Sequence, residues 1–497
     1  MHENCGMAQD SDTKDSDDSK SDSDKKSPPK ETSHTTEHEV SIRGARIPYT
    51  ATAATLILRD AEDEPQASIF HVSYLRGEVA DAAARPVTFA FNGGPGSSAM
   101  WLHLGCLGPR RLMMSDAAAP LPPPYSIVDN EHSLLDITDL VFVDPVGTGY
   151  SRAHGKTKAK EFYEIKRDAS SLAEFIQTWL TKHNRWTSPK FLAGESYGTT
   201  RAAAIADELL QAGVVMNGSV MISNAMHLGT LVFETGNDLP HVLYLPSYAA
   251  VAAYHGAVKP PGGDLESFLK EARAYAIGDY ARALLQGNQL PAEERTQVAL
   301  KLSYFTGLSA AWLERADLRI EIGRFTKELL RERSQVIGRL DARYIGTDPD
   351  HVGELPMEDP SYIQPLGPYT ATVNQYLRQE LGYPDTRRYE AISLKVNESW
   401  SWADDKRMGY PNTAEHLRRS MLMNPHLKVF FANGMYDLAT PFFATEYTAS
   451  HLGREEHIRA NVYQATYPAG HMMYVHPPSM ERLRDDLERF YRAAIPA

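Results

Sequence analysis

The sequence contains little cysteine, which excludes disulfide bonds as its main source of stability. Its 497 residues include two cysteines, Cys5 and Cys106, too few for a disulfide framework. Cys5 lies in a polar segment and Cys106 in a predicted loop or short helix, so we expect no bridge between them. Stability must come from packing, for which 42% hydrophobic residues are sufficient. Low cysteine use fits both a cytosolic and a bacterial envelope protein.

Positive charge and long apolar runs are also scarce. The formal net charge is -13, which argues against a nucleic-acid partner, because neutralising phosphates requires an excess of Lys and Arg. No run approaches the ~18 apolar residues that span a bilayer, so we expect no membrane span. The N-terminus shows no basic region followed by an apolar core, so no secretory signal is visible. Either the protein stays in the cytoplasm or the chain lacks its original leader.

Residues 1–39 are predicted to form a disordered polar tail. Asp, Ser, Lys, Thr and Pro dominate this segment, and it cannot bury enough apolar surface to offset the entropy of ordering. Its Asp-rich part lacks the Gly and the terminal Glu of a calcium-binding loop. His34 and His38 have no further ligand types nearby. We therefore expect a solvated extension without a metal site, and no cofactor.

Short apolar runs predict a mostly parallel sheet. The predicted strands are residues 54–59, 67–75, 87–91, 140–143, 191–193, 220–223, 429–432 and 462–467. The last six are short and lack alternation, as is typical of strands buried on both faces. Residues 165–183 and 201–212 have apolar side chains at helical spacing, and strands alternating with helices indicate an α/β fold with helices on both faces of the sheet.

The pattern divides the ordered chain into three parts. Residues 40–225 are predicted to form the first part of an α/β-hydrolase domain, and residues 396–497 the second part. Between them, residues 226–395 are mostly helical, with predicted helices at 265–285, 291–306 and 315–333. We interpret this middle segment as a helical cap inserted into the α/β domain. Nothing in the sequence indicates an oligomeric state.

The motif Gly194-Glu195-Ser196-Tyr197-Gly198 joins a predicted strand to a predicted helix. In a turn this tight, the glycines let the chain pass close to its neighbours and hold the serine hydroxyl above the sheet. By chance, on the order of one chain in ten of this length carries Gly-x-Ser-x-Gly. The strand before the motif and the helix after it favour Ser196 as a nucleophile.

A serine hydroxyl needs a base to remove its proton and a third group to orient that base. Asp437 follows the predicted strand 429–432, and His471 follows the strand 462–467. The order Ser196, Asp437, His471 is the order of the α/β hydrolases. We therefore predict a catalytic triad of these three residues.

A glycine-rich stretch, Asn92-Gly93-Gly94-Pro95-Gly96-Ser97-Ser98, follows the predicted strand 87–91. Such a loop can present the backbone N–H of Gly94 to a developing oxyanion, with the N–H of Tyr197 as the second donor. A phosphate-binding loop is excluded, because no Gly-Lys-Ser/Thr follows and Pro95 has no N–H.

Taken together, these motifs resemble the serine carboxypeptidase family. The matching stretches are Asn92-Gly93-Gly94-Pro95-Gly96-Ser97-Ser98, Leu107-Gly108-Pro109, Val143-Asp144-Pro145-Val146-Gly147-Thr148-Gly149-Tyr150-Ser151, Gly194-Glu195-Ser196-Tyr197-Gly198, Asn433-Gly434-Met435-Tyr436-Asp437 and Gly470-His471-Met472. The resemblance implies the α/β-hydrolase fold and removal of C-terminal residues from peptides through an acyl-enzyme, without a metal.

By the same resemblance, Asn92, Gly93 and Glu195 bind the terminal carboxylate of the substrate, and Met472 lines that site. A Glu donates to another carboxylate only when it is protonated, so the pKa of Glu195 should be raised by burial and like charge. Activity at acidic pH is then favoured.

The sequence departs from the family pattern at two positions. The family's second Glu, which pairs with the first, is replaced by Cys106, and its Trp in the strand before Asn92 is Ala90 or Phe91. Scarce cysteines and the stretch around Trp101 look more like the bacterial branch, whose members are exported to the periplasm or secreted, although no leader is visible. Two alternatives stay open: an esterase or acyltransferase that uses the same triad, and a catalytically silent binding protein.

Overall fold

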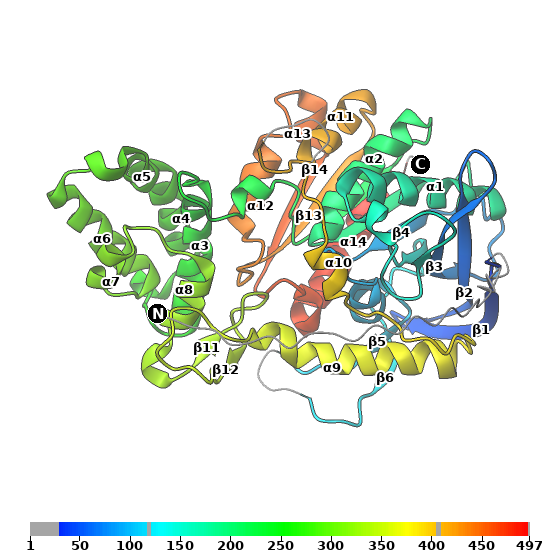
Figure 1. Cartoon of the computed structure of the whole chain (residues 1–497), viewed down its shortest axis with the longest axis horizontal. Coiled ribbons are helices and arrows are strands. Elements are labelled where there is room, and N and C mark those ends of the chain that lie inside the picture. Colours follow the sequence, from blue (N-terminus) through cyan, green and yellow to red (C-terminus); the bar gives the residue numbers. More distant parts are fainter. Residues whose placement is uncertain (1–28, 117–120, 404–408, 496–497) are drawn as a thin grey trace, which may run out of the picture.

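The computed structural model describes residues 29–116, 121–403 and 409–495. Residues 1–28, most of the predicted polar tail and the site of Cys5, lie outside these ranges. Figure 1 shows a body built on a sheet, with a separate lobe of helices on the left. Within the described ranges, no helix combines the length and the apolar character needed to cross a bilayer.

One ten-stranded sheet forms the centre of the body. Its strands are β1 Ser33–Ile42, β2 Ala45–Arg59, β3 Pro65–Arg76, β4 Val87–Phe91, β7 Asp139–Val143, β8 Arg152–Ala153, β9 Lys190–Glu195, β10 Gly218–Ile222, β13 Lys428–Gly434 and β14 Val462–Tyr467. The order is β1-β2-β3-β7-β4-β9-β10-β13-β14, with β8 beside β3. From β7 to β14 all neighbours are parallel, so the predicted mostly parallel sheet is confirmed.

The first strand corrects the prediction of a tail that is disordered as far as residue 39. β1 begins at Ser33 and pairs antiparallel with β2 along its whole length. Its side chains alternate between exposed and half-buried in the first part of the strand, and Val40 and Ile42 near its end are buried. Backbone pairing holds this strand, and such pairing does not depend on apolar side chains, so composition alone misses it.

Helices cover both faces of the sheet (Figure 1). They are α1 Ile165–Lys182, α2 Tyr197–Gln211, α9 Pro360–Gln375, α10 Leu394–Glu398, α11 Ala414–Met423, α12 Phe442–Ser450, α13 Glu456–Asn461 and α14 Pro477–Ala494. Successive residues of β4, Phe89 and Ala90, belong to two different buried clusters. The cluster of Phe89 contains side chains of α1, α2 and α11, whereas the cluster of Ala90 contains those of α9 and α14. Successive side chains of a strand point to opposite faces, so the two clusters are the two cores of an α/β fold.

The separate lobe follows β10 in the chain. Its helices are α3 Leu239–Tyr254, α4 Leu265–Tyr275, α5 Ala281–Gln286, α6 Ala292–Thr306, α7 Ala310–Arg315 and α8 Ile322–Glu328. They enclose their own buried cluster, which includes Phe268, Leu302 and Phe325. The prediction of one helix over 315–333 is wrong, because Asp317 and Leu318 adopt positive φ and end the helical path.

The helix α9 packs on the body, although it lies within the predicted cap. Its residues Tyr369 and Val373 belong to the cluster beneath the sheet, together with Ala90. Two short hairpins accompany it, β5 Arg110–Leu112 with β6 Ile127–Asp129, and β11 Val336–Ile337 with β12 Ile345–Gly346. Because α9 packs on the body, the separate lobe ends before α9 in the chain. The predicted boundary of the cap at residue 395 stays a prediction.

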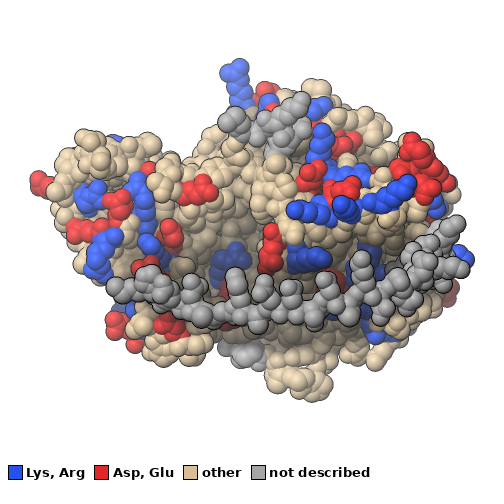
Figure 2. Space-filling model, in the orientation of Figure 1, with Lys and Arg blue, Asp and Glu red and all other residues tan. Residues whose placement is uncertain are grey.

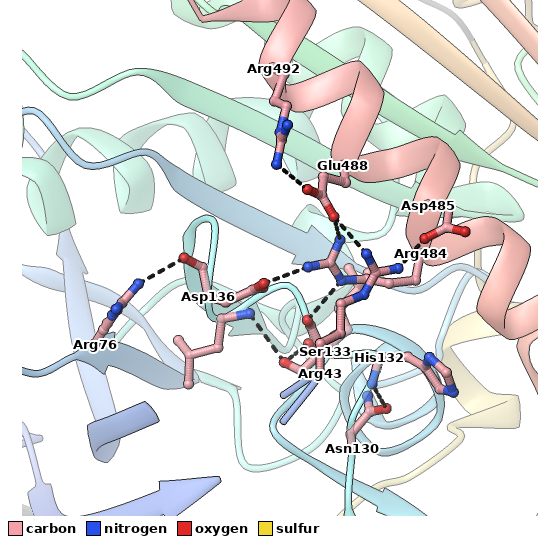
Figure 3. Close-up of polar contacts among 12 residues, drawn as sticks. Arg43, Arg76, Asn130, His132, Ser133, Asp136, Arg484, Asp485, Glu488 and Arg492 are labelled. Atoms are coloured by element: carbon pink, nitrogen blue, oxygen red, sulfur yellow. Dashed lines mark hydrogen bonds and ion pairs between the residues drawn. The ribbon is translucent and has the colours of Figure 1, made fainter. Parts of the chain in front are cut away.

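Hydrogen bonds and ion pairs of charged side chains hold the C-terminal helix α14 against the body (Figure 3). The guanidinium of Arg484, 1% exposed, donates to Asp136 Oδ2 at 2.6 Å, to Glu488 Oε2 at 3.0 Å and to the carbonyl of Ser133 at 3.2 Å. Arg43, in the turn between β1 and β2, donates to the same oxygen of Glu488 at 2.9 Å. The network joins the edge hairpin of the sheet, the loop before β7 and α14.

Replacing Arg484 with Met is expected to lower the free energy of unfolding by about 3 kcal/mol. Loss of a buried cation leaves its carboxylate partners without a counter-charge, which typically costs ~3–5 kcal/mol. The lower end applies because Asp136 and Glu488 retain 25% and 20% side-chain exposure. Urea unfolding measures the change. Arg492→Met is the control, since Arg492 binds the same Glu488 but is 77% exposed, and a loss below ~1 kcal/mol is expected. Equal losses for the two variants would contradict the prediction.

Candidate active site

The predicted nucleophile Ser196 lies in a sharp turn between β9 and α2. Its backbone angles, φ 60° and ψ −129°, are rare for a residue with a side chain. A Cβ atom on Gly194 would lie 2.1 Å from the carbonyl oxygen of Gly198, and one on Gly198 would lie 2.5 Å from that of Phe91. Both glycines of the motif are therefore required by close backbone packing, and the turn leaves Ser196 partly exposed.

The glycine-rich loop after β4 lies against this turn. A Cβ atom on Gly93 would lie 2.5 Å from the amide nitrogen of Tyr197. Tyr197 is the first residue of α2, and the first N–H groups of a helix have no acceptor within it. Gly94 has φ 106°, a conformation that favours glycine. The two predicted oxyanion donors, the N–H groups of Gly94 and Tyr197, thus come from segments in direct contact.

The predicted base and its orienting acid are hydrogen-bonded to each other. His471 Nδ1 lies 2.7 Å from Asp437 Oδ2, and both side chains are buried. Asp437 Oδ2 also accepts from the Thr440 hydroxyl at 2.6 Å, while its Oδ1 accepts from the amides of Ala439 and Thr440 at 2.8 and 2.9 Å. A carboxylate can only accept, so the proton of this pair is on Nδ1. Nε2 is then the imidazole nitrogen that can take a proton.

The surroundings of His471 raise its basicity. Burial lowers the pKa of His471, but the charge and hydrogen bond of Asp437, with the charge of Glu195, outweigh that effect and leave the pKa raised. The backbone is fixed as well, because the carbonyl of His471 accepts from the Ser223 hydroxyl at 2.7 Å. The imidazole is therefore held in place and favours the protonated form more than an exposed histidine does.

The predicted site residues gather around one cavity of about 410 Å³. Figure 2 shows the molecule hollowed between the lobe and the body, with basic and acidic side chains on the walls of the hollow. The predicted residues that line the cavity are Asn92, Gly93, Gly94, Glu195, Ser196, Tyr197, His471 and Met472. Asp437 lies behind His471 and has no exposed surface.

Glu195 lies in the cavity wall, next to Ser196 in sequence, and is 3% exposed. Burial raises its pKa to about 7, against the opposing effects of the charge of His471 and of hydrogen bonds from Tyr474 and Asn92. The Tyr474 hydroxyl donates to Glu195 Oε2 at 2.8 Å. The raised pKa follows the sequence-based expectation, although the like charge comes from Asp437 and not from a second glutamate. Below neutral pH, Glu195 is mostly protonated.

Cys106 stands where the resemblance implies a second glutamate, and its thiol is neutral. Burial, followed by the charge of Glu195, raises the pKa of the Cys106 thiol well above its usual value. Beside it, a Cβ atom on Gly105 would lie 2.4 Å from the Tyr369 hydroxyl and 2.5 Å from the Tyr474 ring, so both tyrosines pack against this glycine. The partner of Glu195 is therefore the hydroxyl of Tyr474, which the sequence analysis did not identify.

Asn92 is held by a buried ion pair that the sequence analysis also missed. Its Oδ1 accepts from the Leu102 amide at 3.0 Å, which leaves the side-chain nitrogen as the group that bonds Glu195. Its carbonyl accepts from Arg201, which is buried and paired with Asp168 at 2.7 Å. A sequence signal was present, since Arg201 is the one charge in the small-residue run at 198–206.

The α/β-hydrolase architecture is defined by three features of the chain: the parallel sheet, the turn at Ser196, and the order Ser196, Asp437, His471. Among solved structures, the chain is similar to Kex1(delta)p, a prohormone-processing carboxypeptidase from Saccharomyces cerevisiae, with a TM-score of 0.55. The similarity covers 89% of this chain and 91% of that chain at 16% sequence identity, so it concerns the fold.

Sequence comparison finds similar proteins over part of the chain. A profile of the serine carboxypeptidases matches residues 59–234, which include the glycine-rich loop and Ser196. Serine carboxypeptidase-like 5 of Arabidopsis thaliana is 32% identical over 152 residues, 30% of this chain and 32% of the plant protein. Serine carboxypeptidase-like 13 of the same plant is 34% identical over 116 residues, 22% of this chain and 25% of that protein. The chain is thus similar to serine carboxypeptidases over residues 59–234, and it spans about a third of the length of serine carboxypeptidase-like 5.

Proposed function

We propose that the protein is a serine-type carboxypeptidase that releases C-terminal residues from peptides through an acyl-enzyme intermediate. The observation that carries the proposal is the shared cavity of Ser196, His471 and Glu195. It combines a serine in a strained strand-to-helix turn, a base paired with a buried acid, and a carboxyl group with a pKa of about 7. Neither a general esterase nor a catalytically silent binding protein requires a carboxyl group such as that of Glu195, whose pKa is raised, beside the nucleophile.

In the proposed reaction, Ser196 Oγ attacks the carbonyl carbon of the last peptide bond while His471 Nε2 takes the hydroxyl proton. The N–H groups of Gly94 and Tyr197 stabilise the resulting oxyanion. Collapse of the tetrahedral intermediate breaks the C–N bond, and His471 gives its proton to the leaving amine. A water molecule then attacks the acyl-enzyme with His471 as base, which releases the shortened peptide and restores Ser196. Asp437 stays ionised throughout and orients the imidazole.

Recognition of the free C-terminus is assigned to Asn92, Gly93 and Glu195, with Met472 lining the same wall. A protonated Glu195 can donate to one carboxylate oxygen of the substrate, and the Gly93 N–H and the Asn92 amide can donate as well. Tyr474 already occupies Oε2 of Glu195, so the acidic proton is expected on Oε1. Substrates with a neutral C-terminal amide make fewer charge-assisted hydrogen bonds in this arrangement.

An esterase or acyltransferase is the second candidate, and Cys106 is the observation that favours it. With a neutral thiol in place of a second carboxyl group, the carboxylate site has one acidic proton fewer to donate. Esters and acyl donors without a free carboxylate would then be accepted more readily.

Hydrolysis of three matched substrates separates the candidates. The wild-type protein is assayed with a blocked dipeptide acid, its C-terminal amide and a simple ester, and the products are identified by mass spectrometry. A carboxypeptidase is expected to prefer the acid to the amide by at least about 100-fold in kcat/KM, the value of two charge-assisted hydrogen bonds. Equal rates on acid and amide, with a faster ester, would overturn the proposal. Treatment with a fluorophosphonate before the assay should abolish all three activities.

The pH dependence is expected to differ between acid and ester substrates. Because the pKa of Glu195 is raised to about 7, its proton is present below that pH and is lost above it. The ratio of kcat/KM for the peptide acid to that for the ester should therefore fall above pH ~7, by about tenfold per pH unit, because deprotonation of His471 favours both substrates alike. Tyr474→Phe removes a hydrogen bond that lowers the pKa of Glu195, so the fall should move to higher pH. A fall at the same pH for both substrates, or an unmoved profile in Tyr474→Phe, would contradict this assignment.

A further inference from the structure

Arg339 provides a positive charge on the wall of the cavity. Among the residues that line this space, it is the one arginine, and no lysine accompanies it. Its side chain is 51% exposed, so the guanidinium is accessible from the cavity. The neighbouring wall is largely apolar, with Leu340, Tyr362 and Pro365 among its residues. A fixed cation in such surroundings attracts an anionic group more strongly than one on an open surface does.

The backbone around Arg339 is held on both sides. The N–H of Arg339 donates to Asp359 Oδ1 at 3.1 Å, and its carbonyl accepts from the Leu438 amide at 3.0 Å. The next residue, Leu340, donates its N–H to the Ser361 hydroxyl at 2.9 Å and accepts from the His471 amide at 2.7 Å. These contacts join the start of α9 to the loops that carry Asp437 and His471. The backbone of Arg339 is thus held relative to the predicted triad.

The acidic neighbour of Arg339 is Asp359, which uses one carboxylate oxygen for hydrogen bonds and keeps the other as an ion-pair partner. Asp359 Oδ1 accepts from the amide and the hydroxyl of Ser361 at 2.9 and 2.5 Å, as well as from the amide of Arg339. Its Oδ2 lies 3.9 Å from Arg339 Nε, beyond hydrogen-bonding distance. The carboxylate therefore fixes the first turn of α9 and forms an ion pair with Arg339 without a hydrogen bond, so the terminal N–H groups of Arg339 can still bind another acceptor. A guanidinium offers such N–H groups in a fork that matches a carboxylate.

The two segments that contact Arg339 also contribute side chains beside Glu195. The loop bonded to Leu340 continues from His471 through Met472 to Tyr474, which donates to Glu195. The helix bonded to Arg339 continues to Tyr369, which packs against Gly105 beside Tyr474. Both segments that hold Arg339 therefore also enclose Glu195. In the proposed function, this is the side that receives the residue to be released.

We propose that Arg339 selects substrates whose released C-terminal residue carries an acidic side chain, Glu or Asp. The inference rests on the proposed carboxypeptidase function and adds its substrate class. The terminal carboxylate binds at Glu195 and Asn92, while the side-chain carboxylate accepts two hydrogen bonds from the guanidinium. The terminal carboxylate and the side-chain carboxylate of the released residue are then bound at different places, one at Glu195 and Asn92 and the other at Arg339.

The test compares blocked dipeptide acids that end in Glu, Gln or Lys, at pH 6 and low ionic strength. The wild type should prefer Glu to Gln by about tenfold in kcat/KM, the value of a partly exposed charge-assisted pair. Arg339→Gln should remove this preference and leave the rate on the Gln peptide within about threefold. Arg339→Lys should retain part of it, and Arg339→Glu should shift the preference to Lys. Raised salt should weaken the wild-type preference, because the charge is partly exposed.

Arg388→Gln is the matched control. Arg388 is 83% exposed, pairs with Glu390 at 3.7 Å and does not line the cavity, so the Glu-to-Gln ratio should equal that of the wild type. An equal loss on all three peptides in Arg339→Gln would show that Arg339 binds the terminal carboxylate or supports the fold, and would overturn the inference. So would a wild type that removes Gln as fast as Glu. A wild type that releases no C-terminal residue at all would instead refute the proposed function.

Discussion

Replacing Ser196 with alanine is expected to lower kcat on a peptide acid by about 100,000-fold or more, with little change in KM. The hydroxyl oxygen forms the bond to the substrate, and without it the acyl-enzyme route is closed. A residual rate above that in water should persist, because the N–H groups of Gly94 and Tyr197 still polarise the carbonyl. Alanine keeps a Cβ atom, so the strain at φ 60° is unchanged and the fold should be retained.

The measurement is product release over hours, read by mass spectrometry, with urea unfolding to verify the fold. Ser97→Ala is a suitable control. Ser97 lines the same cavity, but its hydroxyl donates to the Ser98 carbonyl at 2.9 Å, so a loss of less than about tenfold is expected. If Ser196→Ala keeps more than a tenth of the wild-type kcat while Ser97→Ala behaves as expected, then Ser196 is not the nucleophile.

Replacing Asp437 with asparagine is expected to lower kcat by about 10,000-fold, because the change reverses the hydrogen bond to His471. The amides of Ala439 and Thr440 require an acceptor at Oδ1, so the single oxygen of Asn is kept there. The NH2 group then faces His471 Nδ1, which must become the acceptor. The imidazole proton moves to Nε2, the nitrogen that is needed to take the proton of Ser196. The variant should fold normally and bind substrate, yet remain nearly inactive.

Thr440→Val distinguishes this tautomer effect from a general loosening of the loop. It removes the 2.6 Å hydrogen bond to Asp437 Oδ2 but keeps the carboxylate, so a loss of about tenfold in kcat is expected. Single-turnover kinetics on both variants provide the comparison. Losses of similar size in the two variants would contradict the tautomer argument.

Much of the site was predictable because the parallel strands fix the order in which their loops meet. Ser196, Asp437 and His471 each follow a strand whose apolar run is visible in the sequence, and β4 and β14 have the predicted bounds. The carboxyl ends of parallel strands share one edge of the sheet, so residues distant in the chain are expected at one cavity. The tight glycine turn at Ser196 was predictable for the same local reason.

Two residues that act on the site, Tyr474 through the pKa of Glu195 and Arg339 through the proposed substrate preference, were not predictable. They lie in loops whose positions do not follow from the order of the strands. Tyr474 contacts Glu195 through the path of the loop after β14, and Arg339 lies in a hairpin with no counterpart in the motifs. β1 was missed for a different reason, since its backbone pairing is independent of polar composition. Tertiary contacts of this kind leave no periodic signal in a single sequence.

The hairpin of β11 and β12, which carries Arg339, has a second role besides lining the cavity. The carbonyl groups of Arg339 and Leu340 accept hydrogen bonds from the amides of Leu438 and His471, so this segment stabilises the loops that carry Asp437 and His471. Replacing the lobe together with this hairpin would remove both Arg339 and the hydrogen bonds that stabilise the loops of Asp437 and His471. Grafts that end before β11 and leave the hairpin intact should preserve turnover, whereas grafts that replace it should yield a folded body with a misaligned imidazole.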